Sequence, residues 1–106
     1  MKKKLSNNST SGLFEAILKL ETIEECQNFF EDLCTISELM SMSQRLEVAK
    51  MLNKDAIYTD ISAATGASTA TISRVNRALN YGSDGYKLIL ERIAGDESLY
   101  LLIRNL

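Results

Sequence analysis

The chain contains no proline and no histidine, and only five of its 106 residues are glycine. Because proline and glycine are the residues that most strongly disfavour a helix interior, their scarcity favours an all-helical protein. The sequence also lacks a run of about 18 or more apolar residues, so we expect no membrane-spanning helix. Hydrophobic residues make up 45% and charged residues 25%, which is ordinary for a single globular domain of this length.

The missing histidine also limits the chemistry that the chain can perform. Cys26 and Cys34 are too far apart for a C-x-x-C pair, and no further ligands accompany them, so we predict buried thiols in a reducing compartment and no metal site. A phosphate-binding glycine loop and paired carboxylates in a catalytic setting are absent as well. We therefore predict no catalytic residue, no cofactor and no enzymatic activity.

The start of the chain, M-K-K-K-L-S-N-N, is basic but has no apolar h-region, so it is not expected to be a secretory signal. We interpret residues 1–10 as a flexible arm of a cytoplasmic protein. The net charge of −2 is unevenly distributed. Residues 41–92 carry seven basic and five acidic side chains, whereas residues 1–34 carry four lysines and six acids. A mildly basic half joined to an acidic half argues against strong non-specific binding to nucleic acid.

The segment Tyr58–Leu79 carries the most informative pattern, because two short helical patterns are separated by a tight turn. Gly66 lies where the first helix must end and positive φ is commonly required, and Ser68 is a good N-cap for the second helix. The inward-facing residues are Ile61 on the first helix and Ile72, Val75 and Leu79 on the second. This arrangement predicts a helix-turn-helix.

The face opposite that apolar stripe bears hydroxyl, amide and guanidinium groups, which suit phosphates and base edges. The residues predicted to bind DNA are Ser68, Thr69, Thr71, Ser73, Arg74 and Arg77. Four small residues, Ala63, Ala64, Ala67 and Ala70, suit two helices that cross closely. Ser62 and Thr65 depart from the usual apolar pattern, but their hydroxyls can bond back to the preceding turn.

The remaining sequence predicts further helices and a tail. The expected elements are a helix at Ser11–Leu20, a helical face at 23–33 after the capping box Thr22–Glu25, a long helix at Ser37–Asn53 after the capping box Thr35–Glu38, and a last helix at Gly85–Ile93. We expect Gly95-Asp96 to end the last helix. The fold class is therefore all-α with about six helices, with a domain at 11–94 and a C-terminal tail at 95–106.

Residues 13–33 and 39–52 carry more apolar side chains than one small monomer can cover, which favours a homodimer. A two-fold dimer would also place two recognition helices about one DNA turn apart. The alternative is a compact monomer.

The string G-A-S-T-A-T-I-S-R at 66–74 closely resembles the tryptophan-repressor family. C-T-I-S-E-L at 34–39 and Q-R-L-E-V-A-K-M-L at 44–52 resemble it as well. The strings D-L-C-T and R-V-x-R-x-L-x-Y-G more closely resemble its YerC/YecD-type branch. The resemblance covers about Ile23–Ile93 and implies an intertwined helical homodimer that binds operator DNA.

The resemblance also implies a pair of arginines that hold a corepressor. The second maps onto Arg74, and the first onto Gln44 or Arg45. Val75 stands where the repressor has glycine, and Ala78 where it has serine. The possible effector pocket is therefore Gln44, Arg45, Arg74, Val75 and Ala78, without tryptophan as the ligand and with the identity of any effector open.

Two functions remain open at this point. The first is a sequence-specific, DNA-binding transcription regulator. The second is a helical, dimeric interaction module that has lost operator binding. An exposed polar face with Thr69, Thr71, Arg74 and Arg77 would favour DNA, whereas an exposed apolar patch would favour a protein partner.

Overall fold

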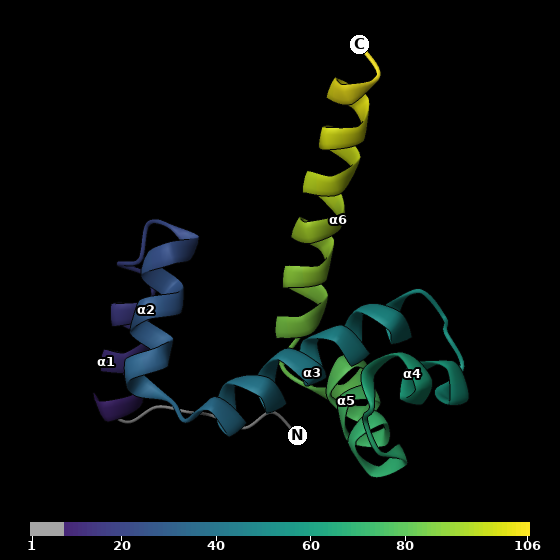
Figure 1. Cartoon of the computed structure of the whole chain (residues 1–106), viewed down its shortest axis with the longest axis horizontal. Helices are drawn as coiled ribbons and strands as arrows, with labels where there is room; N and C mark the ends of the chain where they lie inside the picture. Colours follow the sequence, from purple (N-terminus) through teal and green to yellow (C-terminus); the bar gives the residue numbers. More distant parts are fainter. Residues whose placement is uncertain (1–7) are drawn as a thin grey trace. The chain divides into compact units, whose positions relative to one another are not determined.

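The computed structural model describes residues 8–106, which form six α-helices and no strand within that range (Figure 1). The helices are α1 (Asn8–Ile17), α2 (Ile23–Leu33), α3 (Ile36–Asn53), α4 (Tyr58–Thr65), α5 (Thr69–Tyr81) and α6 (Gly85–Arg104). The expected all-α class is confirmed. The described residues form two compact units, 8–43 and 44–106, and α3 contributes to both. None of the described helices is long and apolar enough to cross a membrane.

The 44–106 unit is built around the helix-turn-helix. Four helices and the turn between α4 and α5 supply its buried core, which consists of Val48, Ala49, Ile61, Ala67, Ile72, Val75, Leu79 and Leu90. Ile61 and Ile72 are fully buried, and Val75 and Leu79 are only 2% and 5% exposed. The apolar stripe predicted from the sequence is therefore confirmed, and it fixes which face of α5 points away from the core.

The turn between α4 and α5 has the predicted glycine geometry. Gly66 adopts a left-handed conformation with φ of 74°, and its N–H donates to the Ser62 carbonyl oxygen at 2.8 Å. The Thr65 hydroxyl donates to the carbonyl oxygen of Ile61 at 2.7 Å, as expected of a back-bond. The Ser62 hydroxyl instead bonds forward across the turn, to the Ala67 carbonyl oxygen at 3.0 Å.

The prediction about the four alanines is mostly wrong. Ala67 is buried at the turn, but Ala63, Ala64 and Ala70 are exposed. The close contact between α4 and α5 is made by Ala67 and the buried isoleucines beside it, because the short turn brings the helices together at that end. The other three alanines lie on the outer surfaces of the two helices.

Of the two predicted capping boxes, the one at Thr35–Glu38 is complete, whereas the one at Thr22–Glu25 has the bond to the N-cap hydroxyl but not the reciprocal one. The Thr35 hydroxyl accepts from the Glu38 N–H at 3.1 Å, and the Glu38 carboxylate accepts from the Thr35 N–H at 2.9 Å. The Thr22 hydroxyl accepts from the Glu25 N–H at 3.0 Å. The Glu25 carboxylate, however, accepts from the N–H of Glu21 at 2.8 Å, one residue before the N-cap.

The 8–43 unit has no buried residue among positions 9–43. Its apolar side chains stay open to solvent in the single chain, with Leu18 84%, Ile23 80% and Ile36 78% exposed. Cys26 and Cys34 are free thiols but only half-buried, so the prediction that they are buried is wrong for the single chain. This unit has no closed core of its own.

The first helix begins and ends about three residues before its predicted limits. Residues 8–10 belong to the first turn of α1, although they were predicted as part of the arm; residues 1–7 of that arm lie outside the described residues. The chain leaves α1 early because Thr22 must be extended to cap α2. The connection therefore starts at Leu18.

The last helix does not end at Gly95-Asp96, as predicted, but continues to Arg104. Glycine costs a helix interior about 0.5–1 kcal/mol relative to alanine, which does not suffice to stop it. The residues around Gly95 are mostly good helix formers, and the helix continues through them. The tail that was predicted separately is thus largely the second half of α6, while the domain limits at residues 11 and 94 stay a prediction.

Candidate nucleic-acid interface

The interface predicted from the sequence is the outer face of α5, and its geometry starts at the N-cap. Ser68 is extended (φ −70°, ψ 158°), and its hydroxyl accepts from the Thr71 N–H at 3.1 Å. The same hydroxyl donates to the Thr71 hydroxyl oxygen at 3.1 Å. The first turn of α5 contains no acidic residue, so the positive end of the helix dipole is not opposed locally. A helix start of this kind favours an approaching phosphate.

Five of the six residues predicted to bind DNA are exposed: Ser68, Thr69, Ser73, Arg74 and Arg77. The sixth, Thr71, is half-buried and takes part in the cap. The structure therefore brings the two guanidinium groups and three hydroxyls to one outward-facing helix, while Ile72 and Val75 secure the inner face. Guanidinium and hydroxyl groups in this arrangement can donate to phosphates and to base edges.

Asn76 and Asn80 form a pair on α5 that the sequence reasoning did not identify. The Asn80 amide donates to the Asn76 carbonyl oxygen at 2.9 Å and to its side-chain oxygen at 3.0 Å. The i, i+4 spacing of two asparagines was the available signal. One of the two lone pairs of the Asn76 side-chain oxygen is thus engaged within the helix, while its N–H₂ group has no bond in these interactions and can donate.

The residues of the possible effector pocket have different surroundings. Val75 belongs to the buried core, whereas Arg74 and Ala78 are exposed on α5. Gln44 and Arg45 on α3 are half-buried. Val75 therefore belongs to the core, and its side chain does not share the exposed surface on which Arg74 lies.

Gln44 has a partner that the sequence did not reveal. Its side-chain amide donates to the carbonyl oxygen of Thr65, the last residue of α4, at 3.1 Å. The two residues are 21 positions apart, so only the packing of α3 beside the helix-turn-helix could bring them together.

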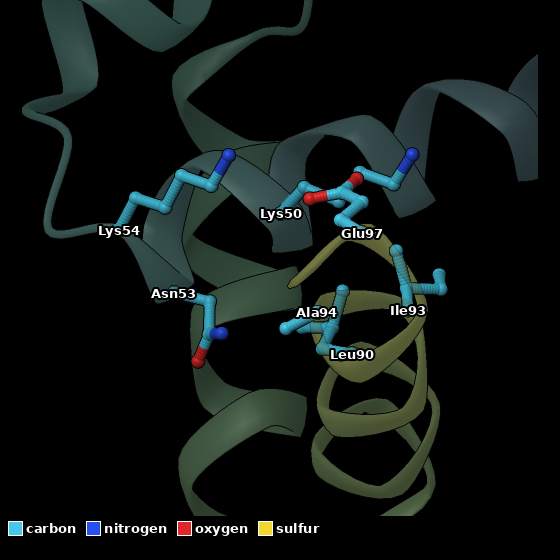
Figure 2. A pocket seen from close by; sticks show the side chains of 7 residues that line it. All are labelled: Lys50, Asn53, Lys54, Leu90, Ile93, Ala94 and Glu97. Atoms are coloured by element: carbon cyan, nitrogen blue, oxygen red, sulfur yellow. The ribbon is translucent and has the colours of Figure 1, made fainter. Parts of the chain in front are cut away.

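A small hollow lies between the end of α3 and α6 (Figure 2). Its lining residues are Lys50, Asn53, Lys54, Leu90, Ile93, Ala94 and Glu97. Its volume of about 50 Å³ is far below the roughly 300–1,000 Å³ of small-molecule sites. Lys50 is also paired with Glu47 at 3.2 Å. The hollow is too small for an organic effector.

Comparison with known proteins connects this geometry to one family. The family model described as Trp repressor protein matches residues 8–94. The YerC protein of Bacillus subtilis is 53% identical over 95 residues, which cover 90% of this chain and 91% of that protein.

Two solved structures are similar in fold as well as in sequence. A TrpR-like protein from Eubacterium eligens has a TM-score of 0.83 and 57% identity, over 85% of this chain and 93% of its own. A Staphylococcus aureus protein proposed to be a Trp repressor has a TM-score of 0.82 and 52% identity, over 85% and 90%. The resemblance seen in residues 66–74 and its extension to the YerC-type branch are therefore confirmed.

Proposed function

The chain belongs to the Trp repressor protein family, a family of DNA-binding regulators rather than enzymes, and on this basis we propose that it is a sequence-specific transcription regulator. The observation that supports this most is the orientation of α5. Its apolar stripe is buried, its start is capped by Ser68, and Arg74 and Arg77 lie on the exposed side. We propose that this regulator acts in the cytoplasm, the site expected from the sequence.

The exposed face of α5 favours DNA over the interaction-module alternative. The discriminating residues Thr69, Arg74 and Arg77 are exposed and polar, and Thr71 is half-buried beside them. The apolar groups exposed on this helix are the methyl groups of Ala70 and Ala78 and the ring of Tyr81 at its end. Two methyl groups and one distant ring do not form the large apolar patch that a protein partner would need.

Regulation by tryptophan does not form part of the proposal. By the resemblance, Val75 and Ala78 stand where the repressor has glycine and serine, so space and a hydroxyl group are both lost. Val75 is 2% exposed, so its side chain fills space between α5 and the rest of the core. We expect calorimetry with millimolar L-tryptophan to show no binding, and clear saturation would contradict this part of the proposal.

The protein is proposed to act as a homodimer. The support is the 8–43 unit, which buries no residue among positions 9–43 in the single chain and leaves Leu18, Ile23, Ile36 and Met40 largely exposed. A second copy of the chain is the partner that family membership suggests for this surface. With two copies, two α5 helices would be available for two half-sites.

Genomic footprinting of the tagged protein tests the proposal and identifies the operator in one experiment. Reproducible footprints that share a sequence, bound by the purified protein, are the expected result. Two results together would favour the interaction module instead. The enriched fragments would share no common sequence, and the pure protein would not shift their electrophoretic mobility.

A further inference from the structure

One hydrogen bond joins α3 to the turn of the helix-turn-helix. The Gln44 side-chain amide donates to the Thr65 carbonyl oxygen at 3.1 Å, in a partly buried setting. Carbonyls in the last turn of a helix have no partner within it, so the carbonyl of Thr65 needs an outside donor. A partly buried carbonyl that loses its donor destabilises the conformation that buries it.

Thr65 also organises the turn itself. Its hydroxyl donates to the Ile61 carbonyl oxygen at 2.7 Å and accepts from the Ala67 N–H at 3.1 Å. The neighbouring Gly66 is left-handed, and a Cβ there would lie 4.0 Å from Nε2 of Gln44. The amide of Gln44 therefore lies directly beside the glycine at which the chain changes direction.

The direction of α5 depends on this turn, because α5 begins at Thr69, only three residues after Gly66. Ala67, between them, is 2% exposed and belongs to the core. A small rotation of the chain at Gly66 would therefore move the whole exposed face of α5 relative to α3. Among the residues that touch the turn, Gln44 supplies a hydrogen bond from outside the helix-turn-helix.

We propose that Gln44 is a positioning residue that fixes the helix-turn-helix turn on α3, so that α5 is set for DNA without a small-molecule effector. The contact is made by the protein's own side chain. This inference rests on the proposed function, and it names the residue that positions the proposed DNA-binding surface. If it holds, the purified chain is competent to bind its operator as it stands.

Hydrogen exchange on the DNA-free protein tests the positioning role without reference to DNA. Gln44→Leu keeps apolar bulk but removes the donor, and Gln44→Arg keeps N–H donors at this position. We expect the hydrogen-bonded amides of the turn, those of Gly66, Ala67, Thr71 and Ile72, to exchange about two- to tenfold faster in Gln44→Leu, the range that follows from the loss of one ordinary hydrogen bond. Gln44→Arg should restore slow exchange, and the amide of the buried Leu90 on α6 should not change in either variant.

The operator identified by footprinting provides the second measurement. Affinity should fall about two- to tenfold in Gln44→Leu and return in Gln44→Arg. Gln27→Leu, the same change at an exposed glutamine of α2, is the matched control and should leave the exchange of residues 66–72 unchanged. Wild-type protein that is unfolded in urea, dialysed in the denaturant to remove small molecules and then refolded should bind as tightly as protein that was never unfolded.

Three results would decide against the inference. Unchanged exchange at 66–72 in Gln44→Leu, or equal loss in Gln44→Leu and Gln44→Arg, would overturn the positioning role. DNA binding that returns to refolded protein only after a small-molecule extract is added would overturn independence from an effector. Faster exchange in Gln44→Leu with no DNA binding by any protein would support the positioning role and contradict the proposed function instead.

Discussion

Ser68 and Thr71 exchange two hydrogen bonds at the start of α5. The Thr71 N–H donates to the Ser68 hydroxyl oxygen, and the Ser68 hydroxyl donates to that of Thr71, both at 3.1 Å. The residue that caps the helix is thus also the first of the residues predicted to bind DNA. Stability and DNA binding can be separated at this position by the choice of substitution.

Ser68→Ala should destabilise the protein by about 1 kcal/mol, because an N-cap hydroxyl is lost. Ser68→Asp should keep the stability, since a carboxylate caps a helix equally well and interacts favourably with its dipole. The same carboxylate would repel a phosphate, so Ser68→Asp should bind DNA more weakly than its stability suggests. Urea unfolding and operator titration check the two parts. Full DNA affinity in a stable Ser68→Asp protein would remove this end of α5 from the interface.

The capping box at the start of α3 makes a pH-dependent contribution. The Thr35 N–H that donates to the Glu38 carboxylate, aided by the Thr35 side chain, holds the pKa of Glu38 below its ordinary value of 4.5. A lowered pKa stabilises the folded state at pH values above 4.5, and this contribution disappears as the pH falls through the lower, folded value. The Thr35 amide resonance should therefore titrate with an apparent pKa below 4.5.

Glu38→Gln is the matched control for that titration. Its amide oxygen can still accept from the Thr35 N–H, but the side chain no longer ionises. In this variant the chemical shift of the Thr35 amide should stay constant across the acid pH range. An apparent pKa at or above 4.5 in the wild type would show that the hydrogen bond to Glu38 does not favour the carboxylate.

Gly95 should be replaceable by alanine with a gain in helix stability. It lies inside α6, and a Cβ built there meets no other atom within 4 Å. Gly95→Ala should stabilise the helix by about 0.5–1 kcal/mol and slow the hydrogen exchange of residues 96–104. Gly12→Ala in α1, where a Cβ is equally free, is the companion variant. Faster exchange in Gly95→Ala would mean that another copy of the chain packs closely against this glycine.

The homodimer predicts a sedimentation-equilibrium mass of twice the 11.8 kDa chain at micromolar concentration. Ile23→Asp should shift it toward the monomer, because Ile23 is 80% exposed in the single chain and apolar. Ile23 is the first residue of α2, where aspartate suits the helix dipole, so the substitution spares the helix itself. A wild-type mass of one chain, or an Ile23→Asp protein as dimeric as the wild type, would contradict the proposed interface.

The helix-turn-helix was predictable from the sequence because its signals are local. Gly66 and Ser68 each specify their own backbone geometry, and the apolar stripe of α5 fixes its inner face within thirteen residues. The capping box at Thr35 is local for the same reason. In each of these cases the residues that carry the signal lie within a few turns of one another in the sequence.

The missed features depend on longer range or on competing tendencies. The partner of Gln44 lies 21 residues away and becomes visible only when α3 is packed beside the turn. Gly95 has the sequence of a helix breaker, but its neighbours outweigh its modest cost. The exposure of Ala63 and Ala70 follows from the place at which α4 and α5 touch, which periodicity alone does not give.

The most direct test of the account is the salt-dependent affinity of Arg77→Ala for the operator found by footprinting. A lost base contact should cost about 1–3 kcal/mol and relax specificity at one position, while a lost phosphate contact would weaken all sequences alike and reduce the salt slope by about one unit. Arg92→Ala, at an exposed arginine of α6, removes the same charge elsewhere and is expected to match the wild type. An Arg77→Ala curve that overlays the wild type at every salt concentration would show that Arg77 does not contact DNA and contradict α5 as the reading helix.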